Sequence, residues 1–190
     1  MKKLIIVLTI VVSISGCLPS LKISESEYKI FNLTQEIAES RDRDFFVSLP
    51  SNWFNTKDVN YHNNEIWLVH ENYSAVIALK KIYLKSELKT LNVLENLLTL
   101  AKVDAELHKR KNALTFKLIS VPGLYRNGNL SYSSFEYSFG KNQIARVVIL
   151  EKNGNYFECI AYSTEKGLAK ISLVELFSIQ ESLISSLNTN

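Results

Sequence analysis

The feature that most constrains the fold is a pair of apolar segments, residues 144–151 and 156–163, separated by a turn at Asn153-Gly154. Asn-Gly is the strongest short signal for a β-hairpin, because both residues accept the positive φ that a tight turn requires. The turn sets the register and pairs apolar residues on one face, Leu150 with Phe157 and Val148 with Cys159. The opposite face is also apolar, with Val147, Ile149, Ile160 and Tyr162. Such a sheet must be covered on both faces.

Two amphipathic segments are predicted to form this cover. Residues 86–109 repeat leucine and alanine at helical spacing, with Ser86 in a capping position and charged residues between the apolar ones. Residues 170–187 show the same spacing of apolar residues. Both segments are therefore predicted to be long helices.

Further strands are expected before and after the first helix, at residues 45–50, 65–70, 73–83, 114–121 and 130–139. The chain has 190 residues, of which 46% are apolar, and this is enough for one sizeable core. The fold class predicted is α+β: a mostly antiparallel sheet of about six strands covered by two long helices, in an α/β/α sandwich.

The N-terminus has the pattern of a secretory signal peptide. Lys2 and Lys3 precede an uncharged, aliphatic run at residues 4–14, which is shorter than the about 17–25 residues that a membrane-spanning helix needs. The next four residues, Ile14-Ser15-Gly16-Cys17, resemble the lipobox of bacterial lipoproteins. This resemblance implies cleavage between Gly16 and Cys17, and lipidation of Cys17.

The predicted organisation follows from that processing. Residues 1–16 are the signal peptide, residues 17–27 the lipidated cysteine and tether, and residues 28–190 one globular domain. Several acyl chains hold a protein firmly on a membrane, whereas one chain binds only marginally. Leu18 stands where retention in the inner membrane would require Asp, so a Gram-negative host implies the outer membrane, with the domain facing the periplasm. Removal of Lys2 and Lys3 leaves 20 basic and 19 acidic residues, which argues against a nucleic-acid partner.

The order of elements resembles the PsbP-like domain, a fold shared by DcrB-type lipoproteins and the extrinsic photosystem subunit PsbP. The matching features are the segment 46–53 (Phe-Val-Ser-Leu-Pro-Ser-Asn-Trp), the apolar strand at 73–79, the helix at 86–109, the hairpin region at 135–159 and the final helix at 177–187. The resemblance covers residues 44–187. It implies a non-catalytic accessory role in a larger assembly, and the cofactor-supporting residues of photosynthetic members have no counterparts here.

No catalytic, cofactor-binding or metal-binding motif is recognised. His62, His70 and His108 form no pair at i,i+4 spacing, and no nucleotide-binding or zinc-protease signature occurs. Glu136 and Glu158 are not nominated as an acid–base pair, because charged residues on strands commonly form surface ladders. Cys159 is expected to be buried in a strand. We therefore predict no cofactor, no metal and no enzymatic activity.

Aromatic residues gather around one predicted hairpin, and we consider them as a surface for protein recognition. Tyr61, Trp67 and Tyr73 are the candidate partner-binding residues, with Trp53 nearby in sequence. Core packing is the alternative for all of them. The function predicted is that of a lipid-anchored envelope lipoprotein that binds an unknown envelope protein assembly through such contacts. The alternative is a lipid-anchored hydrolase or small-ligand carrier, which a deep pocket with convergent ionisable groups would favour.

Overall fold

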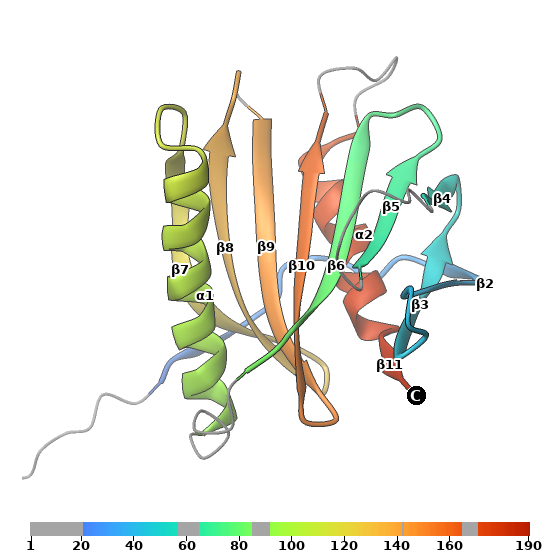
Figure 1. Ribbon diagram of the computed structural model, residues 1–190, viewed down its shortest axis with the longest axis horizontal. Coiled ribbons are helices and arrows are strands. Elements are labelled where there is room, and N and C mark those ends of the chain that lie inside the picture. Colours follow the sequence, from blue (N-terminus) through green and yellow to red (C-terminus); the bar gives the residue numbers. More distant parts are fainter. Residues whose placement is uncertain (1–20, 57–64, 85–91, 142, 165–170) are drawn as a thin grey trace, which may run out of the picture.

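The computed structural model of the protein describes residues 21–56, 65–84, 92–141, 143–164 and 171–190. Within these residues there are eleven strands and two helices (Figure 1). The predicted signal peptide and Cys17 lie outside the described residues, and so does Tyr61. No helix in the described part of the chain is both long and apolar enough to span a membrane.

Eight strands form one large sheet in the order β1-β7-β8-β9-β10-β6-β5-β4. In that order, their bounds are Ile23–Glu25, Lys117–Asn127, Leu130–Phe139, Gln143–Lys152, Asn155–Ser163, Ala75–Ile82, Glu65–His70 and Trp53–Asn55. All neighbouring strands are antiparallel except β1 and β7, which are parallel. The β9–β10 register confirms the prediction from Asn153-Gly154, since Leu150 pairs with Phe157 and Val148 with Cys159.

Three strands form a second, smaller sheet in the order β11-β3-β2. Their bounds are Asn188–Thr189 for β11, Phe45–Pro50 for β3 and Leu33–Glu39 for β2. The predicted strand at 45–50 therefore exists, but it pairs outside the large sheet. In Figure 1 this small sheet lies beside α2 (Leu173–Ser185), away from α1 (Val93–Lys111).

The predicted fold class is wrong in its strand number and in its balance of helix and strand. Strands hold 50% of the described residues and helices hold 22%, and α2 has only 13 residues. One reason is β7, which was expected to end before Pro122-Gly123 but continues to Asn127. Two shifts in the β7–β8 register, between Leu118 and Gly123, absorb the proline and glycine without ending the pairing.

The central strands of the large sheet, β9 and β10, are buried on both faces, as the apolar residues on both of their faces predict. On one face α2 and β3 pack over residues such as Val148, Leu150, Phe157 and Cys159. On the other face α1 packs through Leu97 and Ala101 over residues such as Phe135, Val147 and Ile149. Cys159 is fully buried, which confirms its predicted place in the core.

The helices begin at side-chain caps. Asn92 Oδ1 accepts a hydrogen bond of 2.9 Å from the Leu94 amide at the start of α1, and Ser172 Oγ accepts one of 3.1 Å from Glu175 at the start of α2. Ser86, the predicted cap of the first helix, lies outside the described residues. The last turn of α1 carries His108, Lys109, Arg110 and Lys111. Cations are favourable at that end of a helix.

Candidate functional site

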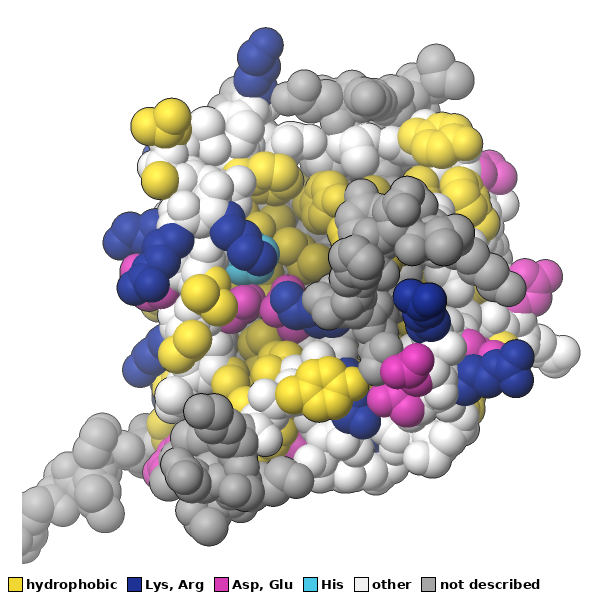
Figure 2. All heavy atoms as spheres, in the orientation of Figure 1, with side chains coloured by type: hydrophobic (Ala, Val, Ile, Leu, Met, Phe, Trp, Pro, Cys, Tyr) yellow, Lys and Arg dark blue, Asp and Glu magenta, His cyan; other side chains and the backbone are white. Residues whose placement is uncertain are grey.

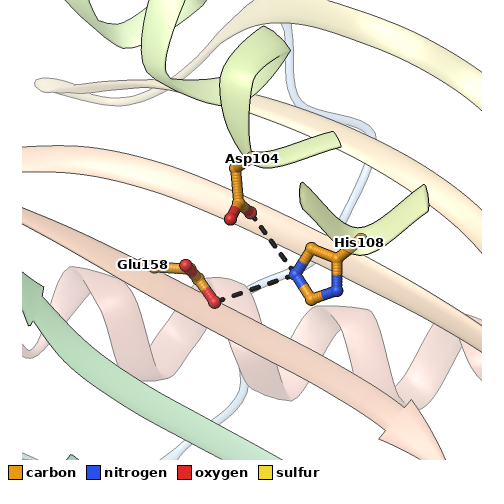
Figure 3. A group of neighbouring side chains, drawn as sticks. All are labelled: Asp104, His108 and Glu158. Atoms are coloured by element: carbon orange, nitrogen blue, oxygen red, sulfur yellow. Dashed lines mark ion pairs between the residues drawn. The ribbon is translucent and has the colours of Figure 1, made fainter. Parts of the chain in front are cut away.

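A cluster of three ionisable side chains lies between α1 and the large sheet. Asp104 and His108 come from successive turns of α1, and Glu158 comes from β10 (Figure 3). His108 Nε2 lies 3.5 Å from Asp104 Oδ2 and 4.0 Å from Glu158 Oε1. One oxygen of each carboxylate and a nitrogen of the imidazole all lie within 4.8 Å of one another. The three side chains therefore converge on one small volume.

Local structure explains why these residues meet. Asp104 and His108 follow Leu97 and Ala101 at helical spacing, so they continue the stripe of α1 that faces the sheet. Glu158 lies two residues before Ile160, whose side chain packs on the α1 side of the sheet. Alternation along β10 places Glu158 on that same side. The sheet-facing stripe of α1 and the α1-facing side of β10 thus bring three ionisable groups together.

Two further residues complete the contacts of the cluster. The Tyr137 hydroxyl lies 2.9 Å from His108 Nδ1, and the two rings are 4.9 Å apart. Lys80, directly opposite Glu158 in the β6–β10 register, places its Nζ 2.7 Å from Glu158 Oε2. His108 is therefore oriented by a hydrogen-bonding group on its far nitrogen, and only one oxygen of Glu158 is used by Lys80.

The electrostatics of the cluster are those of crowded, buried carboxylates. Burial, and then the Asp104 carboxylate, raise the pKa of Glu158, whereas Lys80 and His108 oppose that rise. The pKa of Tyr137 is also raised, first by burial and then by the negative charges of Asp104 and Glu158. Asp104 is 9% exposed, and its Oδ2 has no hydrogen-bond partner among the described residues. The cluster therefore has acceptor capacity that an added cation would satisfy.

The sheet face beside this cluster is incompletely covered by α1, which packs mainly on β7, β8 and β9. Over β10, β6 and β5 the same face carries Ile160, Ala78 and Trp67 in adjacent register positions. Ile160 and Trp67 are half-buried. Figure 2 shows apolar side chains lining a hollow next to α1, with histidine, acidic and basic side chains at its edge.

The aromatic residues nominated from the sequence lie in different surroundings. Trp67 is half-buried within β5, and Trp53 is a core residue at 6% exposed. Tyr73 is 61% exposed in the turn between β5 and β6, where its ring lies 6.1 Å from that of Phe54, itself 38% exposed. Tyr61 lies outside the described residues. An exposed aromatic pair thus exists, but its second member is Phe54, which the sequence did not single out.

The described histidines, His70 and His108, lie in different parts of the fold. His70 lies beside Asn72, with 2.7 Å between Nδ1 and the Asn72 side-chain oxygen, and its ring packs on Trp53. His62 lies outside the described residues. Of the two histidines in the described residues, only His108 belongs to the cluster, with an aspartate rather than a second histidine at i−4. The Asp104-x-x-x-His108 spacing is visible in the sequence, but a criterion of histidine pairs alone does not detect it.

The fold is similar to that of PsbP. Among solved structures, the chain is similar to the solution structure of cyanobacterial PsbP (CyanoP) from Synechocystis sp. PCC 6803, with a TM-score of 0.56 and 12% identity over 82% of this chain and 92% of that chain. A crystal structure from Bacteroides thetaiotaomicron VPI-5482 has a TM-score of 0.49 and 14% identity, with 82% of this chain and 48% of that chain covered. No model of a protein family and no curated protein matches the chain. At these identities the likeness concerns the fold alone.

Proposed function

We propose that the protein is a lipid-anchored lipoprotein of the cell envelope, and that it acts as a non-catalytic accessory module for an envelope protein assembly. The observation that carries this proposal is a complete lipobox at residues 14–17 immediately ahead of a PsbP-like fold. Five residues separate Cys17 from Ile23, the first residue of β1. Such a spacer extends at most about 20 Å, so the lipid would hold the domain close to its membrane leaflet.

The exposed aromatic pair supports recognition by protein contact. Tyr73 has φ of 61°, a left-handed conformation that few non-glycine residues adopt. Its amide donates a 2.7 Å hydrogen bond to the His70 carbonyl, and its own carbonyl accepts one from the Thr164 hydroxyl. The turn therefore holds a large aromatic ring outward beside Phe54. Exposed tyrosine is enriched among the residues that dominate binding energy at interfaces.

Anchoring is tested by mass spectrometry of the native N-terminus and by membrane fractionation. We expect an acylated Cys17 at the N-terminus, and release of Cys17→Ser from the membrane fraction. Cys159→Ala is the matched control, since it removes the other cysteine and leaves the lipobox intact. A Cys17→Ser chain that fractionates with membranes like wild type, or an unmodified N-terminus, contradicts the proposal.

The contact surface is tested by photo-crosslinking in intact cells. A photoreactive phenylalanine analogue replaces Tyr73 in one strain, and Val121, which is 71% exposed on β7, in a control strain. We expect a crosslinked product of discrete mass with the analogue at position 73 and none with it at position 121. Identical products at both positions, or none at position 73, would rule out this surface. Tyr61 and Trp67 remain candidate partner-binding residues, and the same substitution tests them.

The second candidate function, a lipid-anchored hydrolase or small-ligand carrier, is favoured by one observation. The ionisable groups of Asp104, His108 and Glu158 converge beside an apolar hollow. Native mass spectrometry of the chain extracted from membranes separates the two functions, because a carrier retains a small molecule of fixed mass. An accessory module has no such adduct.

A further inference from the structure

We propose that Asp104, His108 and Glu158 form a binding site for a divalent first-row transition metal ion, with Zn²⁺ as the probe. This inference goes beyond the accessory function and does not depend on it. Two independent observations support it: the convergence of three ligand-type side chains, and a buried carboxylate oxygen that receives no hydrogen bond from the described residues.

The separations between the ligand atoms are close to those in a metal site. Zinc binds histidine nitrogen and carboxylate oxygen at about 2.0–2.2 Å, which places the ligand atoms of a tetrahedral site roughly 3.3–3.6 Å apart. His108 Nε2 and Asp104 Oδ2 already have this separation, at 3.5 Å. Glu158 Oε1 lies 4.0 Å from the same nitrogen. A small rotation of the Glu158 side chain would close the remaining distance.

The unsatisfied oxygen of Asp104 favours a bound cation. Asp104 Oδ2 is buried in a residue that is 9% exposed, and it has no hydrogen-bond partner in the described part of the chain. Its contact with His108 is 3.5 Å, longer than a normal charge-assisted hydrogen bond. Burying an ionised oxygen without a partner is costly. A metal ion between Asp104, His108 and Glu158 would remove that cost.

The surrounding residues leave the ligand atoms available. Lys80 occupies Glu158 Oε2, at 2.7 Å, while Oε1 is the oxygen that faces His108. The Tyr137 hydroxyl lies at His108 Nδ1, the far side of the ring. With Nδ1 protonated and donating to Tyr137, Nε2 presents its lone pair to Asp104 and Glu158. A hydrogen-bond partner on the second nitrogen is the usual way in which proteins orient a metal-binding histidine.

The donor set selects the class of metal. One imidazole and two carboxylates suit Zn²⁺ and its neighbours in the first row, whereas Ca²⁺ takes 6–8 oxygen ligands and Mg²⁺ requires near-octahedral oxygen coordination. Three protein ligands leave at least one coordination position for water or a small ligand, as in zinc sites that are not purely structural.

The test uses the untagged full chain, extracted in detergent, freed of metal with a chelator and titrated with Zn²⁺ by calorimetry. We expect one saturable site per chain with Kd in the micromolar range or below. Asp104→Asn, His108→Gln and Glu158→Gln should each raise Kd at least 10-fold. Glu106→Gln is the matched control, because Glu106 lies on the same helix with 63% of its side chain exposed and forms an ion pair with Lys109. Circular dichroism shows whether each variant is folded.

X-ray absorption at the zinc edge gives a second readout that does not depend on affinity. We expect nitrogen and oxygen neighbours with the scattering pattern of one imidazole, and loss of that pattern in His108→Gln. If one variant does not fold, the remaining two still decide the result. Saturation only at millimolar Zn²⁺, equal Kd in wild type and the folded ligand variants, or equal affinity for Mg²⁺ would overturn the proposal.

Discussion

Neutralising Glu181 is expected to destabilise the protein strongly, because this residue is half of a buried ion pair. Arg146 on β9 is 2% exposed and Glu181 on α2 is 0% exposed, and Arg146 Nη2 lies 2.6 Å from Glu181 Oε1. The guanidinium also lies 4.4 Å from the centre of the Tyr28 ring. Burial alone would lower the pKa of Arg146, but the Glu181 carboxylate and the Tyr132 and Tyr28 side chains together outweigh burial, and the pKa is raised. Arg146 therefore carries its charge in the folded protein, opposite the Glu181 side chain.

The magnitude follows from the number of donors that the carboxylate serves. Besides Arg146, Oε1 accepts hydrogen bonds from the Tyr132 hydroxyl and, at 3.0 Å, from Ser26 Oγ. Asn127 Nδ2 donates to Oε2 at 3.1 Å. In Glu181→Gln an NH2 group replaces one carboxylate oxygen, so that two hydrogen-bond donors face each other. The buried positive charge of Arg146 then has no negative charge opposite it. Breaking a buried pair on one side costs about 3–5 kcal/mol. This is a large fraction of the roughly 5–15 kcal/mol that stabilises a typical domain.

Urea unfolding followed by circular dichroism measures the loss in the free energy of unfolding. Glu175→Gln is the control, since Glu175 is exposed in the first turn of the same helix, and it should cost less than about 1 kcal/mol. The double variant Arg146→Met, Glu181→Leu should lose less than the sum of the single variants Arg146→Met and Glu181→Leu, because it removes both charges. A loss below about 1 kcal/mol in Glu181→Gln would show that the pair is not buried as described.

Two further predictions concern Cys159 and Asp44. Burial raises the pKa of the Cys159 thiol to about 12, so a thiol reagent at pH 8 should label it only after unfolding. Labelling rates with and without urea measure this, and rapid labelling of the folded chain would contradict the burial of Cys159. Although burial alone would raise the pKa of Asp44, hydrogen bonds from Ser40 and Lys81 outweigh it and lower that pKa. The carboxylate therefore adds stability above its unfolded pKa, and this stability is lost as pH falls through the lower folded pKa. Asp44→Asn should unfold about 0.5–1 kcal/mol more easily at neutral pH and show a weaker loss of stability in acid, and an unchanged acid profile would refute this.

The parts of the fold that were predicted correctly depend on local signals. Asn153 and Gly154 have φ of 51° and 75°, so the two residues that indicated the turn adopt the conformation that the turn requires. The β9–β10 register then follows from a fixed loop length, and the burial of Cys159 follows from the register. Each inference joins residues that are close in sequence.

The parts that were predicted wrongly depend on very short strands and on irregularities in strand pairing. β3 was recognised as a strand, but its partners are β2 and β11, and β11 consists of only two residues at the C-terminal end. No periodicity can be read from two residues. β7 passes through Pro122-Gly123 because bulges absorb them, and a sequence pattern shows a proline and a glycine but not the bulge. The continuation of β7 raises the strand content, whereas the number of strands was underestimated because β1, β4 and β11 have only 3, 3 and 2 residues.

The cluster of Asp104, His108 and Glu158 could not be predicted for a different reason. Its residues can be read from the sequence, but their proximity in the fold cannot. Asp104 and His108 have i,i+4 spacing and lie on the same stripe of α1 as Leu97 and Ala101. Two polar, ionisable side chains within an apolar stripe must find polar partners in the core. The partner is Glu158, which reaches the pair only because α1 packs on the face of β10 that carries it. The helix pattern thus indicates that a buried polar contact exists. The residue that completes this contact can be identified only from the packing of the helix on the sheet. Polar residues within an apolar helix stripe are therefore the most useful positions to inspect first in chains of this kind.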